Sequence, residues 1–394
     1  MRLKKIYLDS AANTPLDHRV LQAMKPFLSE SFMGNSHGIH ADGVKAMQAV
    51  EDARNKVAIG LGVKPTEVYF TSGATESNNW VLKTLALHND NPHRKEIVIS
   101  AIEHSSILSQ IPDIERLGMK VILVNPEKSG RVAIKAVKQA ITKNTLLVCI
   151  MGVNNETGVS NNINYIGRFA HLMGAWMMAD CTQLFAYGDG SMNVGKLYPY
   201  VDYFTFSGHK IYGPTGVGCL IARQSKPLYP FMSGGSQEKG LRGGTHNTAG
   251  IVGIGKAVEL LSHESHRAHY EKLFAYFMAE IGQINDKLGV KLHLNATPSY
   301  KNIINLNCSC FSKCDDVASL LSLYGVECSA GSACDIQDNP EAEPRPSHVL
   351  MAMGVPKDEI PKSVRISLTK YTTKRDIKYL IQVLTKIAQD YATK

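Results

Sequence analysis

Short runs of continuously apolar residues alternate with amphipathic stretches through the first two thirds of the chain. Runs such as EIVIS, KVILV and TLLVCIM contain almost no polar alternation, which is typical of strands buried on both faces of a sheet. The stretches between them have the periodicity of helices that connect parallel strands. The pattern predicts an α/β fold with a large domain at residues 16–260, built on a mainly parallel, seven-stranded sheet.

The pattern changes after about residue 260. A long amphipathic stretch, SHESHRAHYEKLFAYFMAEIGQIND, precedes shorter apolar runs such as KNIINLNCSCF and SVRISL, and a last helical pattern begins at Thr373. We expect a smaller α+β domain made of residues 1–15 and 261–394. Within it, the polar and proline-rich stretch at 335–346 predicts a mobile loop, because it cannot bury much apolar surface.

Length and composition are those of a two-domain globular protein of 394 residues. No apolar run approaches the roughly 20 residues that cross a bilayer, and the first residues lack a signal-peptide pattern. We therefore expect a cytoplasmic protein with no membrane partner, whose eight cysteines are thiols. The net charge of +8 is spread along the chain, so we expect no direct contact with nucleic acid.

A lysine and an aspartate follow or end two of the expected strands. Lys210 comes after VDYFTF in the segment SGHK, where burial would favour the neutral amine that forms a Schiff base. Asp180 ends AWMMAD and suits the protonated ring nitrogen of a pyridoxal cofactor. Taken singly, Lys210 fits a surface lysine and Asp180 fits a helix cap. Together they favour a site for pyridoxal 5′-phosphate.

The segment TSGATESNN, residues 71–79, predicts a strand-to-helix turn whose free backbone N–H groups bind phosphate. An ordinary capping box from Ser72 to Thr75 is the alternative. The expected phosphate ligands come from this turn and from SGHK: Gly73, Ala74, Thr75, Ser207 and His209. His104 follows EIVIS, where an imidazole can stack on a flat ring and move protons near neutral pH.

In this order, the motifs resemble those of the cysteine desulfurases of the bacterial iron–sulfur assembly and nitrogen-fixation type. The resemblance is carried by YLDSAANTP, FTSGATESNN, EHSSIL, VNNETG, ADCTQ, FSGHKIYGPTGVG, LRGGT, CSAGSAC and VRISL, and extends from residue 7 to about 373. It implies a class-V aminotransferase-like enzyme with the PLP-dependent transferase fold type I. Such an enzyme converts L-cysteine to L-alanine and passes the sulfur to an acceptor protein.

The resemblance also implies how the cofactor is held. Lys210 would bind pyridoxal 5′-phosphate covalently, and Asp180 would meet its ring nitrogen. Gln183 would meet the ring hydroxyl, and His104 would stack on the ring face. Thr245 of LRGGT would reach the phosphate from a second subunit, which implies a homodimer.

For the substrate, the resemblance implies that Asn155 and Arg365 bind the carboxylate, Arg365 as a bidentate fork. Asn35 would lie near the same pocket. Cys334 of GSAC would be the nucleophile that takes the sulfur as a persulfide, and His104 is a hypothetical activator of its thiol. The long stretch after Cys334 suggests a dedicated sulfur acceptor.

Several alternatives remain open at this point. Cys334 could be an inert thiol or could form a resting disulfide with Cys328. The CxCxxxC run of Cys308, Cys310 and Cys314 lacks the paired spacing of zinc sites, so we expect no metal. The alternative functions are a selenocysteine lyase or an aminotransferase of the same fold, and a non-catalytic sulfur-relay scaffold.

Overall fold

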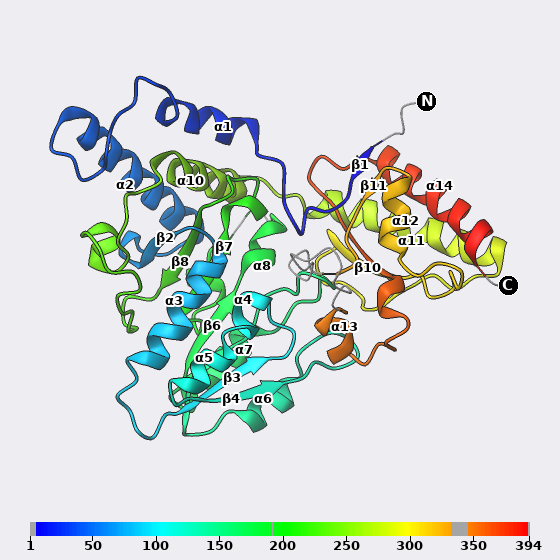
Figure 1. Cartoon of the computed structure of the whole chain (residues 1–394), viewed down its shortest axis with the longest axis horizontal. Helices are drawn as coiled ribbons and strands as arrows, with labels where there is room; N and C mark the ends of the chain where they lie inside the picture. The colour runs from blue at the N-terminus through cyan, green and yellow to red at the C-terminus, as the bar shows by residue number, and fades with distance from the viewer. Residues whose placement is uncertain (1–4, 189, 191, 332–345, 393–394) are drawn as a thin grey trace.

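The computed structural model describes residues 5–188, 190, 192–331 and 346–392. In Figure 1 these residues form a large lobe around a sheet and a smaller lobe, in which the first strand and the last helix lie together. Cys334 and nearly all of the expected loop at 335–346 lie outside the described residues.

The large lobe is built on a seven-stranded sheet in the order β2-β8-β7-β6-β5-β3-β4. Strand β8 runs antiparallel to β2 and β7, and the other neighbours are parallel. The predicted mainly parallel, seven-stranded sheet is therefore confirmed. The strands are β2 (Val68–Thr71), β3 (Glu96–Ser100), β4 (Lys120–Val124), β5 (Thr145–Cys149), β6 (Trp176–Asp180), β7 (Tyr203–Ser207) and β8 (Gly218–Ala222).

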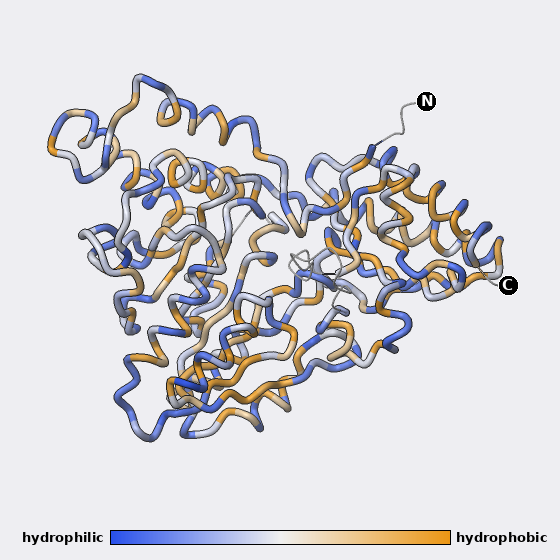
Figure 2. The backbone as a smooth tube through the Cα atoms, viewed as in Figure 1, coloured by the Kyte–Doolittle hydropathy of each residue, from blue (hydrophilic) through white to orange (hydrophobic). Residues whose placement is uncertain are grey.

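Both faces of this sheet are covered, which explains the continuous hydrophobicity of its strands. Along β3, Val98 belongs to one hydrophobic core cluster, whereas its neighbours Ile97 and Ile99 belong to another. Successive side chains of a strand point to opposite faces, so each face needs its own apolar residues. Figure 2 shows the strands as largely hydrophobic segments inside the lobe.

Ten helices belong to the described part of the large lobe, and two of the longest, α2 and α10, cross closely. A Cβ at Gly255 of α10 would lie 2.8 Å from the Cα of Ala53 in α2, so only glycine permits this approach. The helices are α1 (His18–Met24), α2 (Ala41–Leu61), α3 (Ala74–Leu87), α4 (Ser105–Leu108), α5 (Ile111–Arg116), α6 (Ile134–Ala140), α7 (Ile163–Leu172), α8 (Thr182–Ala186), α9 (Val194–Leu197) and α10 (Thr248–His263).

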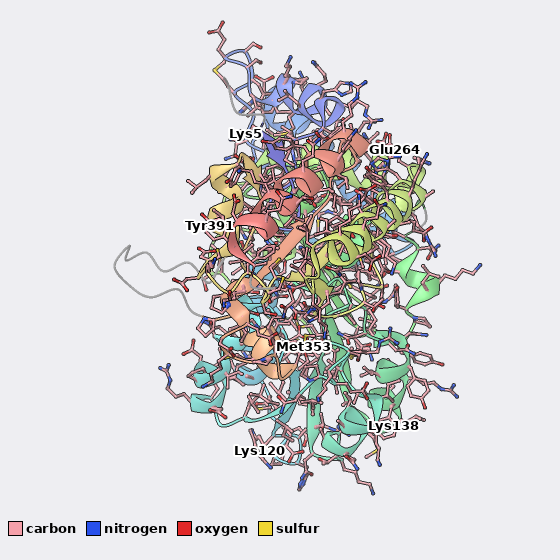
Figure 3. The ribbon with its side chains drawn as sticks, turned by 90° about the vertical axis from the view of Figure 1, so that its right-hand side faces the viewer. Lys5, Lys120, Lys138, Glu264, Met353 and Tyr391 are labelled. Atoms are coloured by element: carbon pink, nitrogen blue, oxygen red, sulfur yellow. The ribbon has the colours of Figure 1, made fainter. Side chains whose placement is uncertain are left out.

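The smaller lobe combines short strands with helices. A parallel pair joins β1 (Ile6–Tyr7) to β11 (Val326–Glu327), so the first residues belong to this lobe. An antiparallel sheet has the order β12-β10-β9, and Figure 3 shows α11 and α14 along its outer side. The remaining elements are β9 (His293–Leu294), β10 (Ile303–Asn307), β12 (Ser363–Ser367), α11 (Arg267–Leu288), α12 (Val317–Leu323), α13 (His348–Ala352) and α14 (Lys374–Tyr391).

Five short 3₁₀ turns in the described residues connect these elements: η1 (Lys25–Phe27), η2 (Pro65–Glu67), η3 (Gly208–Lys210), η4 (Gln237–Gly240) and η6 (Ile360–Lys362). The turn η3 directly follows strand β7, which lies beside the central strand β6 of the large sheet. It therefore places its last residue at the carboxyl end of that sheet.

Each lobe has its own hydrophobic core. Helix α13 follows the small-lobe strand β11 in sequence, yet its Val349 and Leu350 pack in the core of the large lobe. Because the two cores are separate, we propose that residues 16–260 form one domain and that the rest of the chain forms the other. Helix α13 belongs to the second domain in sequence but packs against the first. Among the described helices, none combines the length and the apolar content needed to cross a membrane.

Candidate active site

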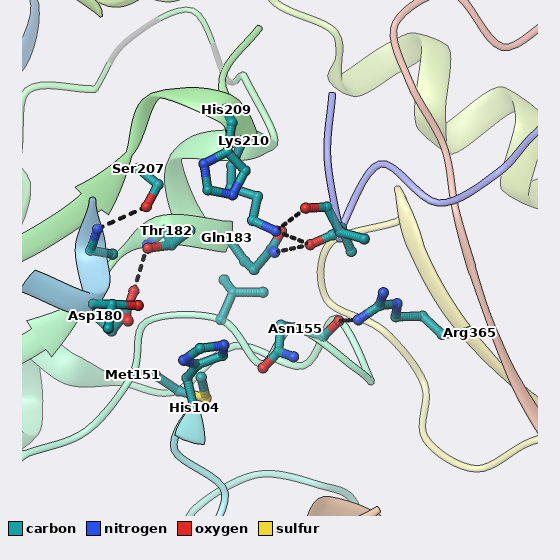
Figure 4. A pocket seen from close by; sticks show the side chains of 15 residues that line it. His104, Met151, Asn155, Asp180, Thr182, Gln183, Ser207, His209, Lys210 and Arg365 are labelled. Carbon is teal, nitrogen blue, oxygen red and sulfur yellow. Dashed lines mark hydrogen bonds between the residues drawn. The ribbon is translucent and has the colours of Figure 1, made fainter. Parts of the chain in front are cut away.

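A pocket lies at the carboxyl ends of strands β6 and β7 and is closed on the other side by the small lobe (Figure 4). It encloses about 780 Å³ of empty space, open solvent at its mouth included, which is the size range of small-ligand sites. Ten residues predicted from the sequence line it: Ala74, Thr75, His104, Asn155, Asp180, Gln183, Ser207, His209, Lys210 and Arg365.

Lys210 ends the turn η3 and points its amine across the pocket. Its Nζ donates to the backbone oxygens of Ala11 and Ala12, at 2.6 Å and 2.5 Å. These carbonyls belong to the segment that links β1 to the large lobe. Figure 4 shows the amine between this segment and the strand ends, so a primary amine is held where a ligand in the pocket can reach it.

Asp180, the last residue of β6, is a buried carboxylate held in a fixed orientation. Its Oδ2 accepts from the side chain of Asn78 at 2.9 Å, and its Oδ1 accepts from the backbone N–H of Thr182 at 2.9 Å. Thr205 in turn donates to Asn78 at 2.6 Å. In the described part of the chain, Asp180 forms no ion pair with a basic side chain. A buried carboxylate needs a cation, and a protonated ring nitrogen would supply it.

Two polar atoms beside Asp180 have no partner among the described residues. They are Oγ1 of Thr182 and Oε1 of Gln183, and both are buried. The amide nitrogen of Gln183 already donates to the backbone oxygen of Ala11 at 3.1 Å. Because buried polar atoms are nearly always hydrogen-bonded, these two fit a bound polar group such as a pyridoxal ring with its hydroxyl.

The part of the pocket at the start of α3 is suited to a phosphate. Helix α3 begins at Ala74 with Gly73 as its N-cap, and this glycine has no side chain to cap the helix, so the N–H groups that follow that of Ala74 are available to an anion. The alternative capping box from Ser72 is therefore not formed. The N–H of Ala74 donates to Oγ of Ser207 at 2.8 Å, which brings two predicted phosphate ligands together.

His209 also lines the pocket. Burial lowers the pKa of His209 to about 4, with the positive charge of Lys210 as a second cause. The imidazole is therefore neutral at physiological pH. It can donate a hydrogen bond to a phosphate oxygen, but it adds no positive charge there.

His104 is the N-cap of the short helix α4. Its Nδ1 accepts from the backbone N–H of Ser106 at 3.1 Å. An accepting Nδ1 places the proton of a neutral ring on Nε2. In Figure 4 the ring faces the pocket beside Met151, as stacking on a bound ring would require.

Arg365 enters the pocket from β12 of the small lobe and is 1% exposed. Its guanidinium donates to Oδ1 of Asp9 at 2.8 Å, to Oγ of Ser329 at 3.1 Å and to the backbone oxygen of Asn155 at 3.3 Å. Its Nε has no partner among the described residues. The side chain is thus preorganised, with a donor left for a carboxylate.

Glu103, directly before His104, is a buried acid that the sequence analysis missed. Its Oε1 accepts from Oγ of Ser100 at 2.5 Å and from the backbone N–H of Met151 at 2.7 Å. Burial raises the pKa of Glu103 to about 8, and the charge of Asp180 adds to the effect. The carboxyl is therefore mostly protonated at neutral pH. The only sequence signal was a glutamate placed after a buried strand.

This protonation predicts a pH effect on stability. Between the usual pKa of 4.5 and the folded value of about 8, the folded chain keeps a proton that the unfolded chain has released. The free energy of unfolding therefore falls as the pH rises through this window. In Glu103→Gln, the amide oxygen replaces Oε1 and the NH₂ group replaces the protonated oxygen. We expect the variant to lose less stability than the parent across the window.

Thermal unfolding of the cofactor-loaded protein, measured near each end of the window, checks this prediction. Glu67→Gln is a suitable control, because the Glu67 carboxylate is also buried but caps a turn away from the pocket. Equal pH dependence of Glu103→Gln and the parent protein would show that the buried carboxyl does not titrate as described.

Two predicted residues, Asn35 and Thr245, do not line the pocket of their own chain. Both are exposed, and they lie close together, because Oγ of the adjacent Ser36 bonds Nδ1 of the adjacent His246 at 2.8 Å. Gly73 also stands just outside the lining, as the cap of α3. Cys334 is outside the described residues.

The cysteines that the structure describes are all free thiols. Burial raises the pKa of Cys328 to about 12, and the charge of Asp9 contributes. Burial also raises the pKa of Cys308, Cys310 and Cys314. Within the described ranges, no group of three or more potential ligands is arranged to hold a metal ion. These thiols are poor nucleophiles.

Comparison with known proteins agrees with this geometry. Residues 6–380 match the family described as aminotransferase class-V. The chain is 37% identical to cysteine desulfurase IscS of Dictyoglomus turgidum, over 99% of this chain and 96% of that protein. It is 35% identical to cysteine desulfurase IscS of Methanosarcina thermophila, over 98% of this chain and 92% of that protein.

Solved structures show the same similarity. A NifS-like protein superposes with a TM-score of 0.85 at 32% identity, covering 98% of this chain and 100% of that chain. The structure described as SspA in complex with cysteine gives a TM-score of 0.78 at 33% identity, covering 93% of this chain and 99% of that chain. DndA from Streptomyces lividans gives a TM-score of 0.74 at 32% identity, covering 92% of this chain and 99% of that chain. The chain therefore belongs to the class-V aminotransferase family and is a cysteine desulfurase, an enzyme that uses pyridoxal 5′-phosphate.

Proposed function

We propose that the pocket between the lobes converts L-cysteine to L-alanine with the cofactor linked to Lys210, and that Cys334 carries the sulfur to an acceptor protein. One observation carries the proposal: Lys210, Asp180 and Arg365 come from separate elements and line one pocket. Each supplies a function that the reaction needs. The likeness to SspA, whose structure is described as a complex with cysteine, supports the choice of substrate.

The cofactor, when bound, supplies an electron sink for the negative charge that develops on the substrate. Asp180 would keep the ring nitrogen protonated, since its carboxylate is buried and oriented by Asn78 and Thr182. Gln183 and Thr182 would bond the ring substituents through their free oxygens. The start of α3, with Thr75, Ser207, His209 and the backbone of Gly73 and Ala74, would hold the phosphate.

Arg365 would bind the substrate carboxylate together with Asn155. Its guanidinium is already fixed by Asp9 and Ser329, so little side-chain entropy is lost when the substrate binds. The amine of Lys210 would move a proton at the substrate α-carbon. His104 would stack on the ring, and the proton on its Nε2 would be available for transfer within the pocket.

The thiol of Cys334 would attack the substrate sulfur. The carbon–sulfur bond of cysteine breaks and a sulfur–sulfur bond forms, so L-cysteine and an enzyme thiol give L-alanine and an enzyme persulfide. Atoms and electrons balance without an external oxidant or reductant. The persulfide would then pass its outer sulfur to the acceptor. The long stretch after Cys334 supports a dedicated acceptor protein.

We also propose that the active enzyme is a homodimer. Asn35 and Thr245 lie side by side at the surface, outside the pocket of their own chain. The region is held firmly, because the buried Glu238 bonds both Arg54 at 2.9 Å and His246 at 3.0 Å. A rigid, exposed segment is suited to completing the site of a second copy.

Mixed dimers test this arrangement. In one dimer, a Lys210→Ala chain is paired with a Thr245→Asp chain, whose new carboxylate would repel the phosphate. If Thr245 serves the opposite subunit, one site of this dimer has both an intact Lys210 and an intact Thr245. We expect it to form alanine at about half the rate of the parent dimer, the share of a single intact site.

The matched control places both substitutions on one chain and pairs it with an unchanged chain. Every site then lacks either Lys210 or Thr245, so this dimer should be inactive. Each chain carries a different affinity tag, so the mixed dimers can be purified by two successive affinity steps. The reverse result, with activity only in the control, would mean that Thr245 acts within its own subunit.

A further inference from the structure

Gly331 and Ser347, the residues on the two sides of the segment that carries Cys334, lie next to each other. A Cβ at Gly331, before the segment, would lie 3.6 Å from Oε2 of Glu156 and 3.7 Å from Cβ of Ser347, which follows the segment. Oγ of Ser347 donates to the same Oε2 of Glu156 at 2.6 Å. A single carboxylate therefore bonds the downstream flank of residues 332–345 and lies beside the upstream flank.

Glu156 is itself held rigidly. Its side chain is fully buried, at 0% exposure. Its backbone N–H donates to Oδ1 of Asn154 at 3.0 Å, and its backbone oxygen accepts from Nδ2 of Asn305 at 3.2 Å. Asn154 also donates to the backbone oxygen of Ile102 at 3.1 Å. The carboxylate thus projects from a turn that is fixed to both lobes.

The downstream flank is docked on the large lobe next to the cofactor residues. Nε2 of His348 bonds the backbone oxygen of Glu103, the residue before His104, at 2.9 Å. Val349 and Leu350 pack in the core of the large lobe. Since Ser347 also caps α13 through the N–H of Leu350 at 3.1 Å, its position determines where the helix begins.

The upstream flank is fixed beside the substrate arginine. Ser329 and Arg365 exchange backbone hydrogen bonds of 2.7 Å and 3.2 Å, and Oγ of Ser329 donates to Asp9 at 2.9 Å. Arg365 also donates to the backbone oxygen of Asn155, the neighbour of Glu156. The turn that accepts a bond from Arg365 therefore also presents the carboxylate that bonds Ser347 and lies beside Gly331.

We propose that Glu156 is a positioning residue for sulfur transfer: it fixes the two ends of the segment bearing Cys334 relative to the substrate arginine. The inference rests on the proposed role of Cys334 and adds a residue that acts through it. A hydroxyl-to-carboxylate bond is short and charge-assisted, and a neutral amide forms a weaker one. A reacting group displaced by about 1 Å can lose about 100-fold in rate.

Glu156→Gln separates positioning from the cofactor chemistry. We expect the variant to keep the visible absorbance of the bound cofactor and the concentration of L-cysteine that half-saturates the spectral change. In a single turnover with ³⁵S-labelled L-cysteine, we expect protein-bound sulfur to form about 10- to 100-fold more slowly, as for a displaced reactive group. Glu67→Gln, a buried carboxylate away from the pocket, should match the parent protein in all three measurements.

Ser347 provides a second test that does not depend on the folding of the Glu156 variant. Ser347→Ala should slow labelling in the same way, whereas Ser347→Thr, which keeps the hydroxyl, should restore it. Parent-like labelling in both Glu156→Gln and Ser347→Ala would overturn the inference. Loss of the substrate-induced spectral change together with labelling would also overturn it, because Glu156 would then have a general structural role. Absence of label from the parent protein would instead refute the proposed role of Cys334.

Discussion

We expect Lys210→Ala to lose alanine formation by about 10⁴-fold or more, the scale seen when a residue that acts covalently is removed. The variant should also lose the visible absorbance of the bound cofactor. The amine of Lys210 is the only lysine nitrogen that lines the described pocket, and it is the nucleophile that links the cofactor to the protein. Absorbance spectra with added pyridoxal 5′-phosphate, and alanine release from L-cysteine, measure both effects.

Two further variants make this test specific. Lys210→Arg keeps the positive charge but cannot form the covalent link, so it should be as inactive as the alanine variant. Lys196→Ala, a change of an exposed lysine on α9, should match the parent protein. An alanine variant that keeps both the absorbance and the activity would show that another amine holds the cofactor.

The second large effect concerns Cys334. We expect Cys334→Ala to bind the cofactor and to show the spectral change with L-cysteine, because no residue of the described pocket is altered. Persulfide formation and multiple-turnover alanine release should fall by about 10³-fold or more, as when a nucleophile is lost. Labelled sulfur on the protein and alanine in solution report these two steps separately.

Cys328→Ala is the matched control, since this thiol lies six residues earlier in the sequence. Burial raises the pKa of Cys328 to about 12, so its thiolate is scarce and the substitution should leave sulfur transfer intact. If Cys328→Ala abolished labelling while Cys334→Ala retained it, the nucleophile would have been assigned to the wrong cysteine.

The elements of the large sheet were predictable because burial on both faces leaves a direct trace in the sequence. EIVIS corresponds to β3, residue for residue. The last helix was also located, and Thr373 is its N-cap. Helix α13 was harder to place, because its short apolar pattern does not say which lobe it packs on. Only the structure shows Val349 in the core of the large lobe.

The residues at strand ends were predictable because parallel strands bring their carboxyl ends to one edge. Lys210 and Asp180 meet there for this reason. Asn78 and Glu103 were missed, since a polar residue inside a helix or after a strand has many ordinary roles. Their importance depends on the partner that packing supplies, here the Asp180 carboxylate and the N–H of Met151.

Asn35 and Thr245 show another limit of sequence reasoning. The pattern of each motif does not itself say which copy of the chain the residue serves, and only the resemblance implied a second subunit for Thr245. Both lie at the surface next to the bonded pair Ser36 and His246. Whether these residues serve a second subunit depends on how two chains assemble, and the mixed dimers test this.

The central claim is that one pocket joins Lys210 covalently to pyridoxal 5′-phosphate, and chemical trapping measures this directly. The loaded protein is treated with borohydride, which converts the link to a stable amine, and is then digested for mass spectrometry. We predict that the added mass of the reduced cofactor is found on the peptide that contains Lys210. A fully loaded protein whose Lys210 peptide is unmodified, with the added mass on a different lysine, would contradict the claim.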